Sequence, residues 1–177
     1  MQHRKAFTLL ELIVVIFIIT IMGGIMFSSS MHKEKEAKKV LDPTTLPTTF
    51  RETFKGQGDV ELFCVEKGKE CYTLQSGKIS PYTDGTEFGN DIEIYTLDSD
   101  DHFVQLEELG RVKDKKIALR YHLYPNGSTT QMVIKNSDGI FYLPSYFGNA
   151  KKVEEMDDAK ALWTKEKYDL GDSGSFF

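Results

Sequence analysis

Residues 7–27 read Phe-Thr-Leu-Leu-Glu-Leu-Ile-Val-Val-Ile-Phe-Ile-Ile-Thr-Ile-Met-Gly-Gly-Ile-Met-Phe, and this stretch decides how the chain is organised. Glu11 is its only charged residue. As a helix the stretch would be roughly 31 Å long, about the thickness of the hydrocarbon core of a bilayer. The sequence therefore predicts one membrane-spanning helix over residues 7–27.

The residues on either side of this stretch leave two interpretations of its processing. Residues 1–6, Met-Gln-His-Arg-Lys-Ala, form a short positively charged leader. A secretory signal peptide would be cleaved after the small residues Ser28-Ser29-Ser30, ahead of Met31. The apolar core is longer than the ~7–15 residues usual in signal peptides, and it contains a carboxylate. Both features favour an anchor that stays in the membrane over a removed signal peptide.

Residues 5–16, Lys-Ala-Phe-Thr-Leu-Leu-Glu-Leu-Ile-Val-Val-Ile, resemble the class III leader of type IV pilins and type II secretion pseudopilins. The resemblance implies that prepilin peptidase removes residues 1–6 by cutting between Ala6 and Phe7. The same enzyme would then methylate the new N-terminus at Phe7. Most members of this family have glycine before the cut, so Ala6 departs from the usual pattern.

Glu11 would become the fifth residue of the processed chain. The resemblance implies that its carboxylate meets the N-terminal amine of a neighbouring subunit and sets the register of assembly. An ionisable group inside a membrane segment needs such a partner. The alternative is a glutamate near a helix N-terminus that is stabilised by the helix dipole alone.

Residues 28–41 have helix-forming composition and are followed by Asp42-Pro43, which is typical of a helix end. We expect them to continue the first helix as its extracytoplasmic half. The remaining residues, 42–177, would then form one globular head.

The head has the pattern of a mostly β domain. Stretches between turn-forming residues predict strands at residues 60–65, 72–74, 92–97, 103–106, 117–123, 130–135 and 140–143, and apolar residues alternate along 117–123. The last three are expected to form a three-stranded meander through turns at residues 125–128 and 136–139. Its Pro-Asn-Gly and Asp-Gly turns are similar to those of H-type minor pseudopilins.

A helix should close the head at residues 153–168, with Met156, Ala159, Leu162 and Trp163 on its apolar side. The expected fold class is α+β. A long N-terminal helix would precede an antiparallel β-rich head with a C-terminal helix.

The two cysteines, Cys64 and Cys71, are placed for a disulfide. A two-residue turn at Lys67-Gly68 would set them opposite each other on a hairpin, within bonding distance. Export of the head to an oxidising compartment would favour the bond. A reduced pair is the alternative, and zinc is not expected because no second Cys/His pair has ligand spacing.

No other group of residues indicates a ligand. Asp98, Asp100 and Asp101, and likewise Asp169 and Asp172, lack the spacing of a calcium loop. The sequence contains no nucleophile elbow, phosphate-binding loop or metalloprotease helix, so we expect neither an enzyme nor a cofactor.

The charge of the chain argues against nucleic-acid binding. It has 22 Lys and Arg against 27 Asp and Glu, for a net charge of -5. One basic cluster interrupts this acidity, and we interpret it as a charged, solvated strand edge. Its members are Arg111, Lys113, Lys115, Lys116 and Arg120.

Together, the resemblance and these patterns predict a structural minor pilin or pseudopilin. Its head would lie in the periplasm or another extracytoplasmic space, held by a single pass through the inner membrane. Its partners would be other pilin-like subunits and prepilin peptidase, in a type II secretion, type IV pilus or DNA-uptake filament. The alternatives are a signal-anchored extracytoplasmic binding domain and an uncharacterised enzyme.

Overall fold

The computed structural model describes residues 9–31, 40–112, 114–146 and 148–172. The chain divides into two compact units, Met1–Ala37 and Lys38–Phe177. The first contains helix α1 (Leu9–Met31), and the second is the head.

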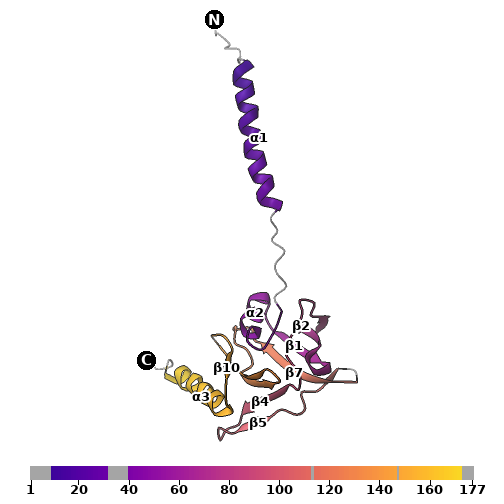
Figure 1. Cartoon of the computed structure of the whole chain (residues 1–177), viewed down its shortest axis with the longest axis vertical. Coiled ribbons are helices and arrows are strands. Elements are labelled where there is room, and N and C mark those ends of the chain that lie inside the picture. The colour runs from indigo at the N-terminus through magenta and orange to yellow at the C-terminus, as the bar shows by residue number, and fades with distance from the viewer. Residues whose placement is uncertain (1–8, 32–39, 113, 147, 173–177) are drawn as a thin grey trace. The chain divides into compact units, whose positions relative to one another are not determined.

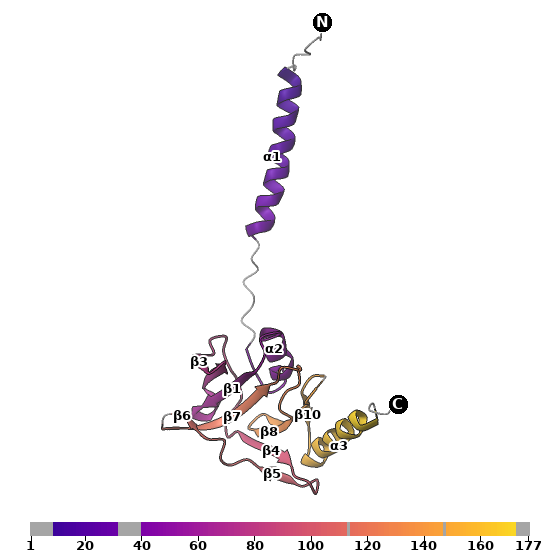
Figure 2. The same ribbon diagram turned by 180° about the vertical axis from the view of Figure 1, so that it is seen from behind.

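The head is built from two five-stranded antiparallel sheets (Figures 1 and 2). The first sheet has the order β3 (Lys78–Pro81), β2 (Glu70–Gln75), β1 (Val60–Val65), β7 (Lys115–Leu123) and β6 (Arg111–Val112). The second has the order β10 (Lys151–Val153), β9 (Gly139–Leu143), β8 (Met132–Asn136), β4 (Glu93–Leu97) and β5 (Phe103–Gln105).

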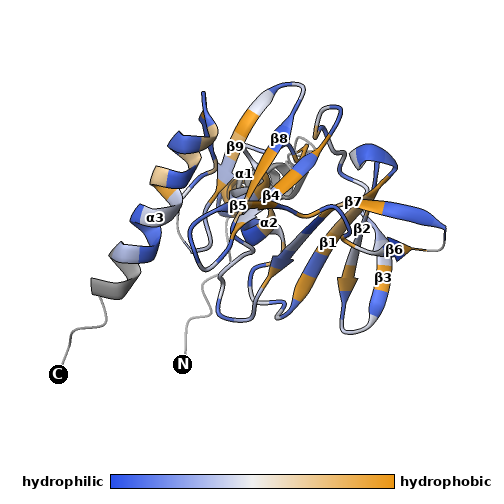
Figure 3. Ribbon diagram, turned by 90° about the horizontal axis from the view of Figure 1, so that it is seen from below, coloured by the Kyte–Doolittle hydropathy of each residue, from blue (hydrophilic) through white to orange (hydrophobic). Residues whose placement is uncertain are grey.

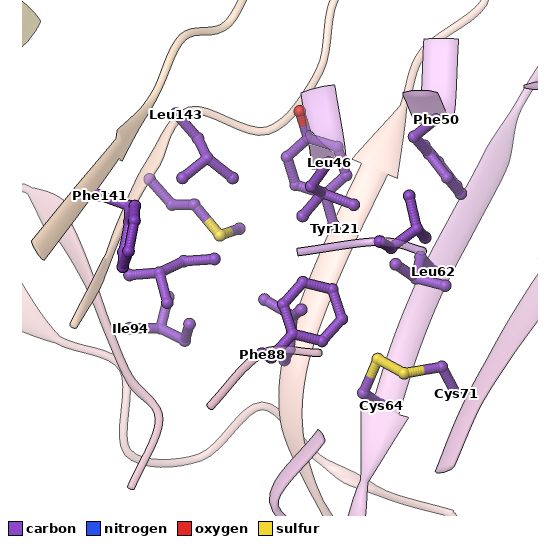
Figure 4. Packing of buried hydrophobic residues seen from close by; sticks show 14 of the residues in the cluster. Leu46, Phe50, Leu62, Cys64, Cys71, Phe88, Ile94, Tyr121, Phe141 and Leu143 are labelled. Carbon is purple, nitrogen blue, oxygen red and sulfur yellow. A yellow bond between two sulfur atoms is a disulfide. The ribbon is translucent and has the colours of Figure 1, made fainter. Parts of the chain in front are cut away.

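The main core of the head lies between the inner faces of the sheets (Figure 4). Leu62 and Leu119 from the first sheet, and Ile134 and Leu143 from the second, are fully buried. The hydropathy of β7 alternates along the strand (Figure 3), which places Leu119 and Leu123 in this core. β1 is buried on both faces, with Leu62 in the main core and Phe63 in a second cluster. Each large apolar side chain buried in this way contributes about 1.5–3 kcal/mol.

A short helix, α2 (Leu46–Thr53), covers one end of this core with the buried residues Leu46 and Phe50. This helix was not predicted from the sequence. Pro47 lies in its first turn, where the missing N–H of proline costs no helical hydrogen bond. A proline at this position is a helix-start signal that can be read from the sequence.

The C-terminal helix, α3 (Met156–Asp172), packs on the outer face of the second sheet. Its Ala159 and Trp163 are buried against Val133 and Tyr142. Met156 and Leu162 are partly buried in the same cluster, as the apolar side predicted from the sequence requires. The prediction of an α+β fold with an N-terminal helix, antiparallel sheets and a C-terminal helix is confirmed at this level.

The expected three-stranded meander is wrong in one pairing. β8 and β9 pair as predicted, but β7 belongs to the other sheet. β7 pairs with β1 along residues 117–123 and with β6 at Lys115 and Lys116, and an isolated bridge joins Leu123 to Thr129. The buried Thr129 donates its N–H to the Ser145 carbonyl at 2.6 Å, and the chain crosses there to the second sheet.

The first helix was expected to reach Leu41, whereas α1 ends at Met31. Residues 32–39 lie outside the described residues. Leu41 is not helical. It is fully buried and forms a parallel bridge with Thr86, through hydrogen bonds to the Gly85 carbonyl and the Glu87 N–H.

Candidate functional site

Helix α1 has an apolar surface on all sides. The large apolar side chains between Leu9 and Ile19 are between 46% and 78% exposed. A helix of a soluble domain normally has one apolar stripe and one polar face, and α1 has no polar face over these residues. Its described side chains therefore require a surrounding that is itself apolar.

The two polar side chains described in α1 differ in character. Thr20 directs its hydroxyl to the carbonyl oxygens of Ile16 and Phe17, at 2.6 and 3.0 Å, so its polarity is satisfied within the helix. Glu11 lies in the first turn, where the helix dipole favours a negative charge. It is the only charged residue of the helix.

The other predicted processing residues, Ala6 and Phe7, lie outside the described residues. Among the residues whose side chains are described, no helix is long and apolar enough to cross a membrane.

The structure contains a disulfide between Cys64 and Cys71 (Figure 4). The two residues are direct partners in the β1–β2 register, with their Cα atoms 4.0 Å apart. The turn differs from the expected two-residue one. A 3-10 turn at Glu66–Gly68, followed by Lys69, joins the strands.

The hairpin loop fits tightly against the segment before β4. Gly68 has a φ of +85°, and a Cβ at this position would lie 2.7 Å from the Ile92 side chain. The Thr86 hydroxyl donates to the Gly68 carbonyl oxygen at 3.2 Å. Thr86 also bridges to Leu41, so the disulfide-closed loop supports the point where the chain joins the head.

The predicted basic cluster does not act as a unit. Lys115 bridges Glu66 and Glu70, at 2.7 and 2.8 Å, and these hydrogen bonds raise its pKa. Arg120 pairs with Glu61. Arg111 and Lys116 are opposed across β6 and β7, while Lys113 lies outside the described residues. Lys115 and Arg120 are thus paired with carboxylates, and of the described members of the cluster Arg111 lies on an edge strand, β6.

The acidic loop between β4 and β5 is used for local structure. Asp98 accepts hydrogen bonds from the N–H groups of His102 and Asp100, which hold its pKa below the usual value. Asp101 pairs with Lys167 of α3 at 3.3 Å. Over the described residues, no group of acidic, His or Cys side chains could hold a metal ion.

Glu166 is a polar residue with a structural role that was not predicted from the sequence. Glu166 of α3 accepts hydrogen bonds from the N–H groups of Ser145 and Tyr146, at 3.0 and 3.1 Å, and from the Tyr142 hydroxyl. Burial and this carboxylate raise the pKa of Tyr142. Helical periodicity places Glu166 near the apolar side of α3, but no local signal identifies its partners.

In the described parts of the chain, a mostly apolar helix with one glutamate near its N-terminus precedes a head of two sheets that contains a disulfide. Residues 1–27 match the family model of the prokaryotic N-terminal methylation motif, which is the class III prepilin leader of type IV pilin-like proteins. No curated protein and no solved structure matches the chain.

Proposed function

We propose that this protein is a structural minor pilin or pseudopilin subunit that is anchored in the inner membrane by its N-terminal helix. The observation that carries the proposal is the match of residues 1–27 to the N-terminal methylation motif. In this proposal prepilin peptidase cuts between Ala6 and Phe7 and methylates Phe7. The mature helix then begins at Phe7 and continues into α1.

The chemistry of α1 supports this function. A helix without a polar face is stable in lipid or against other apolar helices, and a filament subunit uses both surroundings in turn. Glu11 is the one charged group of α1, so its pairing with a neighbouring subunit would fix the position of the helix along the filament axis. Pairing with the Phe7 amine of a neighbouring subunit would neutralise a carboxylate that is costly to keep in an apolar surrounding.

The head would contact other subunits or cargo outside the inner membrane. The disulfide agrees with an oxidising compartment. Type II secretion, type IV pili and DNA-uptake filaments all use such subunits. Among subclasses, we propose a minor pseudopilin of the H type, on the resemblance of the turns at residues 125–128 and 136–139. The net charge of -5 favours protein partners over direct contact with DNA.

The test is the mass of the N-terminal peptide of protein extracted from membranes, with and without prepilin peptidase. We expect a peptide beginning at N-methyl-Phe7 only when the peptidase is present. Ala6→Leu is the matched variant, because it enlarges the residue before the cut and should leave the leader attached. An intact Met1 in the presence of the peptidase would contradict the proposal, and a start at Met31 would indicate a secreted binding domain.

A further inference from the structure

The edges of the two sheets are not equally protected against pairing with another strand. Proteins commonly protect an edge strand with charged residues, especially lysine, or with proline. β3 contains Lys78 and Pro81, β10 contains Lys151 and Lys152, and β6 contains Arg111. The fourth edge, β5, reads Phe103-Val104-Gln105 and has no charged residue and no proline.

The hydrogen-bond pattern of β5 shows which backbone groups point away from its sheet. Leu106 donates its N–H to the Ile94 carbonyl at 2.8 Å, and the His102 carbonyl accepts from Asp98 at 2.9 Å. Bonded residues alternate along an antiparallel strand, so Val104 is also a bonded position. Phe103 and Gln105 therefore direct their N–H and C=O groups outward, where a further strand would lie.

An open cleft of about 490 Å³ lies beside this edge, between the two sheets. Its lining includes Ile94 and Leu106 from the second sheet side and Ile117 and Ala118 from β7. Leu106 is 38% exposed, and Val104, which lies on the same face of β5, is 42% exposed. Within β5 the cleft is lined by Gln105, at the end of the strand, and it lies between residues of the two sheets there.

The charged residues that line the cleft balance in sign, with Glu66, Glu93 and Glu107 against Lys67, Lys115 and Lys116. Glu66 pairs with Lys115 at 2.7 Å, Glu93 with Lys135 at 3.5 Å, and Lys67 with Asp91 at 3.6 Å. A ligand of this cleft therefore meets apolar side chains beside charged groups that carry no net charge. Complementarity favours a segment whose inward side chains are uncharged.

We propose that β5 and the cleft beside it form a docking site for an extended, uncharged segment of a partner protein. The segment adds to the second sheet as a further strand by bonding to the outward groups of Phe103 and Gln105. Every second side chain of the segment enters the cleft, because side chains alternate across a strand. This inference concerns the head and is independent of how the N-terminal helix is processed.

The test uses the full-length protein in detergent micelles and an end-blocked, fluorescein-labelled peptide of alternating Val and Thr. Binding is followed by fluorescence anisotropy. Gln105→Pro removes an outward N–H without breaking a bond to β4, and we expect it to weaken peptide binding at least tenfold. Ala118→Phe fills the cleft and should weaken binding to a similar extent.

Ile79→Pro is the matched control. Tyr82 donates to the Cys71 carbonyl, so by the same alternation Ile79 has an outward N–H on the β3 edge. This variant should bind the peptide as the wild type does. Thermal unfolding of each variant verifies that the head is folded.

Three results would overturn the proposal. The first is no binding of the peptide by the wild-type protein at millimolar concentration. The second is equal binding by the wild type and Gln105→Pro. The third is concentration-dependent self-association of the wild type that Gln105→Pro abolishes, which would assign this edge to a second copy of the chain.

Discussion

Asp42 organises the backbone where the chain enters the head. Its carboxylate accepts hydrogen bonds from the N–H groups of Thr44 and Thr45 and from the Thr44 hydroxyl. Its own N–H donates to the Thr45 hydroxyl at 3.1 Å. The turn that these bonds form starts α2 and fixes the position of Leu41, which is buried in the core.

Replacing this carboxylate should therefore destabilise the head. We expect Asp42→Ala to lower the free energy of unfolding by about 1–2 kcal/mol, in the range of lost helix caps. Asp42→Asn keeps an acceptor oxygen and should cost less. Denaturant unfolding of the three proteins measures the difference. Glu108→Ala, at an exposed position, is the control and should change stability by less than about 0.5 kcal/mol.

The same residue makes stability depend on pH. Burial acts to raise the pKa of Asp42, but the hydrogen bonds from Thr44 and Thr45 outweigh it and hold the pKa below its usual value. A lowered folded-state pKa stabilises the head above the unfolded pKa of about 3.9, and this stability is lost as pH falls through the folded pKa. Unfolding midpoints measured between pH 6 and pH 2 should therefore fall less steeply for Asp42→Asn. Identical slopes would contradict this origin.

At the scale of elements, the β1–β2 hairpin depends on its disulfide. The bond between Cys64 and Cys71 closes a small loop and should contribute about 2–3 kcal/mol. We expect the double variant Cys64→Ala, Cys71→Ala to lose about this amount in denaturant unfolding. Reductant should destabilise the wild type and leave the variant unchanged. Two freely alkylated cysteines in native protein from cells would contradict the oxidised hairpin.

Helix α3 is held to the second sheet by an apolar contact and by Glu166. Removing the carboxylate leaves the N–H groups of Ser145 and Tyr146 and the Tyr142 hydroxyl without this acceptor. We expect Glu166→Ala to cost about 2–3 kcal/mol. Trp163 belongs to this helix and is buried against the sheet. In the variant its fluorescence should shift toward that of an exposed indole at a lower denaturant concentration than in the wild type. Lys165→Ala, at the exposed neighbouring position, should leave that transition in place.

At the scale of the whole molecule, the sequence predicted the elements whose pattern is local. The apolar residues 60–65 and the alternation in residues 117–123 predicted β1 and β7, and the spacing of Cys64 and Cys71 predicted the register of β1 with β2. Pairing between distant segments was less predictable, because β7 pairs along most of its length with β1, which lies far away in the sequence. The short strands β3, β6 and β10 were missed because two to four residues carry too little periodicity.

The candidate functional residues were likewise predictable only where they form a local pattern in the sequence. The leader and Glu11 were recognisable because they form one contiguous motif. Glu166 was not, since its hydrogen-bond partners are about 20 or more residues away in sequence and meet it only through the fold. The open edge of β5 could not be predicted from the sequence either. The register with β4 decides which backbone groups of β5 point outward.

Glu11 provides the prediction that belongs to the assembled protein. If its carboxylate sets the register between subunits, Glu11→Ala should abolish incorporation into filaments while the head stays folded. The carboxylate is the only charge in α1, so no other side chain of that helix can replace it. Incorporation is measured by the protein recovered with filaments sheared from cells, and folding by the unfolding transition of the head.

Thr20→Ala is the matched control in the same helix. The Thr20 hydroxyl bonds only to carbonyl groups one turn earlier, so its loss should leave assembly unchanged. Glu11→Gln separates charge from hydrogen bonding, because the amide can accept a hydrogen bond but cannot neutralise an amine. Recovery of Glu11→Ala with filaments at the wild-type level would refute a register role and leave α1 as an anchor alone.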